Sequence, residues 1–157
     1  MTPQLQAFID VCAATVAATP TPADCVERLA AAMLGLVGAA ESFLEPRDRR
    51  SGDDGYSRNL IYAAADDTLS LYALVWRPGQ WTPIHDHGSW EVVGVVEGVL
   101  EERNFARVDE HRDSTRDDGI DLVRVGIILL SSGAVTTFVP NPDHIHLTGV
   151  DKSRAPG

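Results

Sequence analysis

Two histidines in the middle of the chain, His85 and His87, have a spacing that suits metal binding. They lie in the stretch 79–98, GQWTPIHDHGSWEVVGVVEG, with Glu91 four residues after His87 and a glycine at each end. Successive side chains of an extended strand point to opposite faces, so a His-x-His pair puts both imidazoles on one face. Imidazole is a ligand for zinc, copper, iron and nickel. The sequence therefore predicts a shared metal ion here. The alternative is that both histidines lie on a polar edge and bind nothing.

A second His-x-His pair, His144 and His146, closes the stretch 133–146, GAVTTFVPNPDHIH. These two side chains again share a face, and spacing alone does not choose the ligand between them. A metal-bound imidazole commonly needs a neighbour that orients it, so either histidine of the pair can have that role. Asp86, between His85 and His87, is expected to point to the opposite face and not to ligate.

The five residues Gly79, His85, His87, Glu91 and Gly98 resemble the first cupin motif at every spacing, and 133–146 resembles the second. This resemblance implies an all-β fold, a cupin β-barrel (double-stranded β-helix or jelly roll). It implies His85, His87 and His146 as metal ligands, and it leaves open whether Glu91 is a further ligand. It implies for His144 a place beside the ligands or at the entrance of the site.

A finer resemblance is to the thiol dioxygenases, the cysteine dioxygenase branch of the cupins, over about residues 56–150. It is carried by Tyr56-Ser57-Arg58-Asn59-Leu60, Trp76, Pro83-Ile84-His85-Asp86-His87 and Ile145-His146. The resemblance implies Fe²⁺ on three histidines and oxidation of a small thiol, L-cysteine in the first place, by O2 to a sulfinic acid. It implies that Arg58 pairs with the substrate carboxylate and that Tyr56 and Trp76 line the same end of the pocket. The alternative for Arg58 is a surface salt bridge.

Two features depart from that branch. Its members usually have glycine or cysteine near the position of Glu91, and they continue into a strand with a serine, a histidine and a catalytic tyrosine. The residues 151–157, DKSRAPG, contain no tyrosine, so no catalytic tyrosine is assigned in this chain. Two alternatives stay open. One is a cupin oxygenase or isomerase with three histidines and Glu91 around Mn, Fe, Ni or Zn. The other is a non-catalytic cupin that binds a metal or small molecule.

The length, charge and composition of the chain limit the functions that are possible. A chain of 157 residues predicts one domain. The net charge of −10, from 23 acidic and 13 basic residues, disfavours nucleic acid and anionic membranes as partners. Cys12 and Cys25 form no disulfide framework. No signal peptide and no stretch of ~20 apolar residues is found, so a cytoplasmic protein is expected. The sequence does not indicate an oligomeric state.

The expected elements follow from hydrophobic periodicity and turn residues. Helical spacing after Thr2-Pro3 and again after Thr21-Pro22 predicts two helices within 1–43 that cover a sheet. The polar segment 44–55 is expected to be a solvated loop. The segment 106–121 is expected to be a second loop, with His111 as a surface histidine. Seven strands are predicted, and their short, even spacing favours a sandwich or barrel over 56–150. They span 56–64, 69–76, 80–87, 90–105, 122–130, 135–140 and 144–150, with turns expected near Gly88-Ser89 and, within 90–105, near Glu97-Gly98.

Overall fold

The computed structural model describes residues 1–18, 21–109, 120–140 and 144–153, so the predicted surface histidine His111 lies outside the described residues. Two helices precede the strands, α1 (Pro3–Ala18) and α2 (Pro22–Gly38), followed by a short 3₁₀ turn, η1 (Ala40–Ser42). The strands are β1 (Ser57–Ala63), β2 (Ser70–Val75), β3 (Glu91–Gly94), β4 (Val99–Arg107), β5 (Leu122–Ser131), β6 (Val135–Phe138) and β7 (Ile145–Gly149). The two predicted N-terminal helices and the predominance of strands are confirmed.

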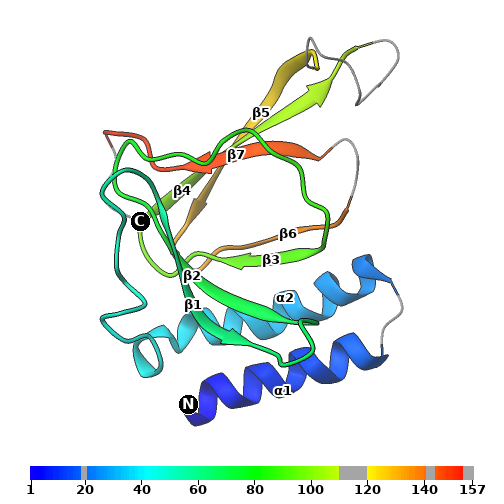
Figure 1. Ribbon diagram of the computed structural model, residues 1–157, viewed down its shortest axis with the longest axis vertical. Coiled ribbons are helices and arrows are strands. Elements are labelled where there is room, and N and C mark those ends of the chain that lie inside the picture. Colours follow the sequence, from blue (N-terminus) through cyan, green and yellow to red (C-terminus); the bar gives the residue numbers. More distant parts are fainter. Residues whose placement is uncertain (19–20, 110–119, 141–143, 154–157) are drawn as a thin grey trace.

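The helices form where local signals predict them. Thr21 caps α2 by accepting a hydrogen bond from the backbone N–H of Asp24, and Pro22 takes the first helical position. The buried faces of the two helices meet in one apolar cluster, in which Leu29 and Cys12 are almost completely buried. Figure 1 shows the helix pair on one side of the molecule, with β3 and β6 lying over α2. No helix among the described residues is long and apolar enough to cross a membrane.

The strands form three antiparallel sheets. β1 pairs with β2, β3 pairs with β6, and the third sheet has the order β5-β4-β7. The predicted hairpin at Asp66-Asp67 is confirmed by the β1–β2 pairing, and Asp67 has the positive φ of 58° that a tight turn uses. Among the described residues these pairings do not join into a closed barrel, so the structure supports a β-rich fold with two helices, and the cupin barrel stays a prediction.

The predicted strand 80–87 is shorter and more irregular than expected. Its residues form single bridges, Trp81 with Gly149 and His85 with His146, and no continuous strand. Pro83 lies between the two bridges and has no backbone N–H to donate, which explains the interruption. The turn predicted near Glu97-Gly98 is confirmed: it divides 90–105 into β3 and β4, and Gly98 has a φ of 76°. The segment 81–85 nevertheless runs beside β7 and extends the third sheet.

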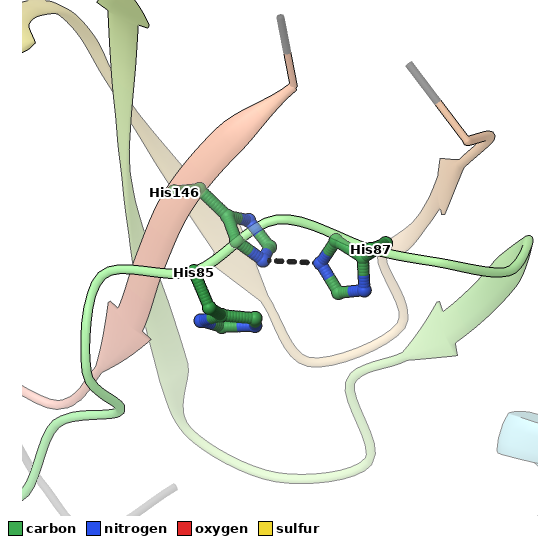
Figure 2. Close-up of side chains that lie close together, drawn as sticks. All are labelled: His85, His87 and His146. Atoms are coloured by element: carbon green, nitrogen blue, oxygen red, sulfur yellow. Dashed lines mark hydrogen bonds between the residues drawn. The ribbon is translucent and has the colours of Figure 1, made fainter. Parts of the chain in front are cut away.

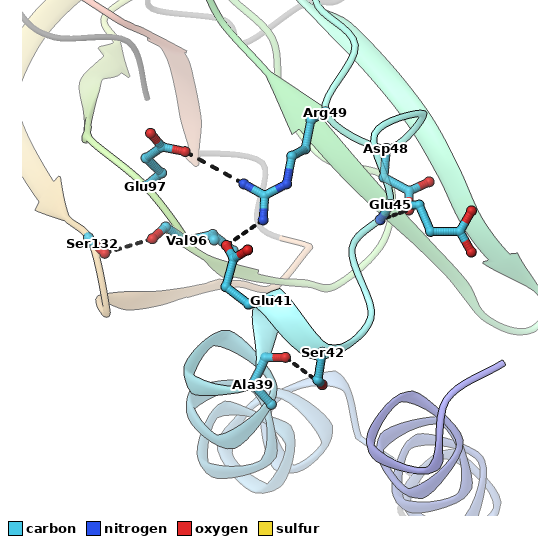
Figure 3. A network of polar contacts seen from close by, with 9 residues as sticks. All are labelled: Ala39, Glu41, Ser42, Glu45, Asp48, Arg49, Val96, Glu97 and Ser132. Atoms are coloured by element: carbon cyan, nitrogen blue, oxygen red, sulfur yellow. Dashed lines mark hydrogen bonds and ion pairs between the residues drawn. The ribbon is translucent and has the colours of Figure 1, made fainter.

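The polar segment 44–55 is held in place by specific contacts and is not simply solvated. Asp48 is buried, and its carboxylate accepts a hydrogen bond from the Glu45 N–H at 2.9 Å. The Arg49 guanidinium pairs with Glu41 after α2 and lies 3.7 Å from Glu97 between β3 and β4 (Figure 3). The Asn59 amide donates to the Asp48 carbonyl oxygen at 2.9 Å, which fixes the start of β1, the strand that carries Arg58.

Candidate metal site

A backbone pairing brings the two His-x-His motifs together. The N–H of His85 donates to the carbonyl oxygen of His146 at 2.9 Å, and the N–H of His146 donates to the carbonyl oxygen of His85 at 2.9 Å. Residues paired in this way on antiparallel strands project their side chains to the same face. The Trp81–Gly149 bridge continues the same antiparallel pairing, with a one-residue shift of register between Trp81 and His85. Sequence positions 61 residues apart therefore become neighbours on one surface.

The imidazoles of His85, His87 and His146 converge. Their ring centroids are 4.7 to 4.9 Å apart, and the Nε2 atoms of His87 and His146 are 2.7 Å apart (Figure 2). Each residue offers one nitrogen such that all three nitrogens lie within 4.8 Å of one another. His146 is almost completely buried, and His85 and His87 are partly buried. The structure thus gathers the three histidines that the cupin resemblance implies as ligands.

Each of the three rings has an acceptor beside its other nitrogen. The Nδ1 of His85 lies 2.9 Å from the Pro83 carbonyl oxygen. The Nδ1 of His87 lies 3.1 Å from Oε1 of Glu91, and the Nδ1 of His146 lies 3.5 Å from Oε1 of Glu102. A carbonyl or carboxylate oxygen can only accept, so these contacts favour the proton on Nδ1 and the lone pair on Nε2. That is the tautomer a metal ligand needs.

Glu91, for which the sequence left open whether it binds the metal, lies on the Nδ1 side of His87. Its side chain is 45% exposed, and it pairs with the histidine four residues earlier. Phe138, which lies opposite Glu91 in the β3–β6 pairing, stacks on the His87 ring with centroids 5.2 Å apart. Within the described part of the chain, the converging donors are the three histidines, and Glu91 is not one of them.

A second group of possible ligands was missed from the sequence. Glu102, His144 and His146 also offer atoms within 4.8 Å of one another. Glu102 is 2% exposed and lies on β4 beside β7. The available signal in the sequence was weak: β4 is rich in charged residues, and only its alternation puts Glu102 on the same strand face as the buried Leu100. His144 lies 3.9 Å from Glu102 on its Nε2 side, beside the ligand group as the sequence suggested.

Burial sets the charge states of this cluster. Burial lowers the pKa of His85 and of His144 below 6.5, so both imidazoles are neutral at pH 7. Burial alone would raise the pKa of Glu102, but its contacts with His146, the Asn104 amide and His144 outweigh burial and lower it. The pKa of Glu102 is therefore below its usual 4.5, and the carboxylate is ionised at pH 7.

The donor set fits a divalent cation. If Nδ1 of His87 donates to Glu91, its Nε2 is a bare lone pair, and the 2.7 Å contact to His146 then needs a proton or a cation between the rings. Nitrogens bound to one first-row ion at about 2.1 Å lie about 3.0 Å apart in octahedral and about 3.4 Å apart in tetrahedral coordination, so a small separation of the two rings would admit the ion. A proton on Nε2 of a neutral His146 leaves its buried Nδ1 bare against the Glu102 carboxylate, and that Nδ1 has no hydrogen-bond partner. A cation removes this conflict.

The residues implied in substrate binding line the same cavity. Arg58, Tyr56 and Trp76 share with the three histidines a cavity of about 1010 Å³. The Tyr56 and Trp76 rings stack with centroids 5.3 Å apart, and the Arg58 guanidinium lies 4.8 Å above the Tyr72 ring. No carboxylate of the described residues forms an ion pair with Arg58, so the alternative of a surface salt bridge finds no support there.

No model of a known protein family matches the chain. The site is therefore defined by its own residues: three converging imidazoles, the oxygens beside their Nδ1 atoms, and an arginine without an ionic partner in the described chain, on the wall of one cavity.

Proposed function

We propose that this protein is a cupin-type thiol dioxygenase that uses Fe²⁺ and O2 to oxidise L-cysteine, or a similar small thiol, to its sulfinic acid. One observation carries the proposal. One nitrogen from each of three imidazoles converges on the wall of a cavity that also contains a guanidinium with no carboxylate partner among the described residues. A thiol that also carries a carboxylate matches both groups.

The histidines His85, His87 and His146 would hold the metal. Because neutral imidazoles leave the charge of a bound divalent ion uncompensated, the site favours an anionic ligand, and a thiolate is such a ligand. A ferrous ion bound there would supply the activation of O2. In the net reaction the S–H and O–O bonds break and two S–O bonds form. Sulfur loses four electrons, the two oxygen atoms gain four, and the thiol proton is released.

The substrate carboxylate would be held by Arg58. A planar guanidinium binds a carboxylate through two parallel hydrogen bonds, which fixes the orientation of the ligand as well as its position. The face of Tyr72 supports the guanidinium from one side. The stacked pair of Tyr56 and Trp76 gives the same end of the cavity a rigid apolar wall. Together these residues would place the sulfur of a short amino acid at the histidines.

The position of Glu91 supports this function over the four-ligand cupin. A carboxylate ligand would occupy a position that substrate or O2 needs and would reduce the positive charge of the site. The contact of Glu91 with Nδ1 of His87 favours a role in orienting that ring.

The test is an assay for sulfinate. The protein is loaded with Fe²⁺ without oxygen, then given L-cysteine and O2, and the sulfinate formed is compared with the O2 consumed. We expect Arg58→Ala to raise the KM for L-cysteine about 10- to 100-fold, because a charge-assisted hydrogen bond is worth about 1.5–3 kcal/mol. Oxidation of cysteamine, which has no carboxylate, should change little.

Arg124→Ala is the matched control. Arg124 is an exposed arginine on β5 and does not line the cavity, so its loss should leave both substrates unaffected. Absence of sulfinate from a protein that contains iron would overturn the proposal. An equal loss with cysteine and cysteamine in Arg58→Ala would remove Arg58 from carboxylate binding.

A further inference from the structure

We propose that Glu102 is a positioning residue of the metal site, holding His146 with its Nδ1–H toward the carboxylate and its Nε2 toward His85 and His87. The inference rests on the metal site of the proposed function but not on the reaction or the substrate. It concerns a residue that no cupin motif of the sequence includes.

The register of the third sheet places Glu102 behind His146. Across the β4–β7 pairing Asn104 lies opposite His146 and Glu102 opposite Thr148. Side chains two apart on a strand share a face, so Glu102, Asn104 and His146 project to the same side of the sheet. The Glu102 carboxylate thereby reaches the Nδ1 side of the His146 ring, 3.5 Å from that atom, while the ring's Nε2 lies 2.7 Å from His87.

Both partners are buried, and each has a polar atom without a hydrogen-bond partner. Glu102 is 2% exposed and its Oε2 has no hydrogen-bond partner, and the Nδ1 of His146 has none either. A carboxylate removed from water to this extent is costly unless it is paired. The ion-pair contacts of Glu102 among the described residues are to His144 and His146. A slight approach of the His146 ring would complete an Nδ1–H hydrogen bond to the carboxylate.

The neighbouring acid shows that Glu102 differs from an ordinary buried ion pair. Glu101 is also buried, but it faces the other side of β4 and accepts a hydrogen bond from the Arg103 guanidinium at 2.8 Å. Glu101 is thus matched by a permanent positive charge. Glu102 is matched by the imidazoles of His144 and His146 and by the Asn104 amide, none of which is a permanent charge. A divalent cation bound at Nε2 of His146 would supply the missing positive charge through the ring.

The same geometry distinguishes His144 from His146. The Nε2 of His146 faces His87, whereas the Nε2 of His144 faces Glu102 at 3.9 Å. Glu102 therefore lies between the two histidines of the second motif. His146 is left as the one directed at the other two ligands, the choice that sequence spacing could not make.

The experiment measures metal affinity and does not involve a thiol or O2. The metal-free protein and its variants are titrated with Co²⁺ in competition with a chromophoric chelator, and the visible spectrum of the bound Co²⁺ is recorded. Removal of a residue that orients a ligand typically costs 10- to 100-fold in metal affinity. We expect a loss in that range for Glu102→Leu and a smaller loss for Glu102→Gln, whose amide oxygen still accepts from Nδ1. We also expect a changed Co²⁺ spectrum for the leucine variant.

Glu101→Gln is the matched control, because it removes the neighbouring buried carboxylate on the opposite strand face; its Co²⁺ affinity should equal that of the parent. Thermal unfolding of the metal-free proteins tests folding, and Glu102→Leu should still unfold in one cooperative transition. The inference is overturned if the folded leucine variant binds Co²⁺ with an affinity within about twofold of the parent. It is also overturned if the parent binds no Co²⁺. Lost affinity in the leucine variant without sulfinate formation by the parent supports it while refuting the proposed reaction.

Discussion

The contact between Glu91 and His87 leads to a prediction with a defined magnitude. The Glu91 carboxylate lies 3.1 Å from Nδ1 of His87, on the side of the ring away from the converging Nε2 atoms. A carboxylate that orients a metal-bound histidine typically contributes 10- to 100-fold in metal affinity. The Glu91 side chain is 45% exposed, so water weakens its effect and the lower end applies. We expect Glu91→Ala to weaken Co²⁺ or Fe²⁺ binding about tenfold, or about 1.4 kcal/mol.

The Glu91→Gln variant distinguishes a Glu91 that orients the His87 ring from a Glu91 that binds the metal itself. Its amide oxygen still accepts from Nδ1 of His87, so we expect its affinity to lie closer to the parent than to Glu91→Ala. Chelator competition under anaerobic conditions measures both variants, with Glu97→Gln as a control at an exposed acid that pairs with Arg49. An equal loss of well over 100-fold in both variants would identify Glu91 as a ligand and refute the three-histidine site. Unchanged affinity in Glu91→Ala would show that the contact has no part in metal binding.

Three further predictions concern stability. Gly149→Ala should destabilise the protein by about 1–3 kcal/mol and weaken metal binding, because the new Cβ would meet the Gln80 carbonyl oxygen beside the histidine pairing. Urea unfolding and Co²⁺ titration measure the two effects. Gly126→Ala, whose Cβ would meet open space, is the control and should change neither stability nor Co²⁺ affinity. Leu29→Ala, in the helix core, should cost about 2–5 kcal/mol in urea unfolding with unchanged Co²⁺ affinity. Burial raises the pKa of Cys12 from 9.0 to about 11; the folded state therefore keeps a proton that the unfolded chain loses, and stability should fall from about pH 9 to 11. Urea unfolding across this range should show a smaller decline for Cys12→Ala.

Local signals in the sequence were sufficient for several elements. The Thr21-Pro22 cap, the apolar helical spacing and the Asp66-Asp67 turn each act within a few residues, and each has its expected result in the structure. The His-x-His spacing of His85 and His87 is likewise a local signal, because it acts within three residues.

Other parts of the site depend on pairing between distant strands. The location of Glu102 behind His146 follows from the register of β4 against β7, and the side of His87 that Glu91 occupies follows from the turn before β3. Strand alternation puts position 102 on the same face as Leu100, but it does not indicate which residue of another strand lies beside it. The interruption at Pro83 likewise became apparent only from the bridges to β7.

The most direct test of the proposed thiol dioxygenase is the origin of the oxygen atoms in its product. The iron-loaded protein would oxidise L-cysteine under oxygen-18 gas in ordinary water, and mass spectrometry would count the labelled atoms in the cysteine sulfinate, with His146→Ala as the ligand-deficient control. We expect both sulfinate oxygens to be labelled in the parent and no product above background in the variant. Unlabelled or singly labelled sulfinate, or equal product from the variant, would contradict dioxygen transfer at the three-histidine site.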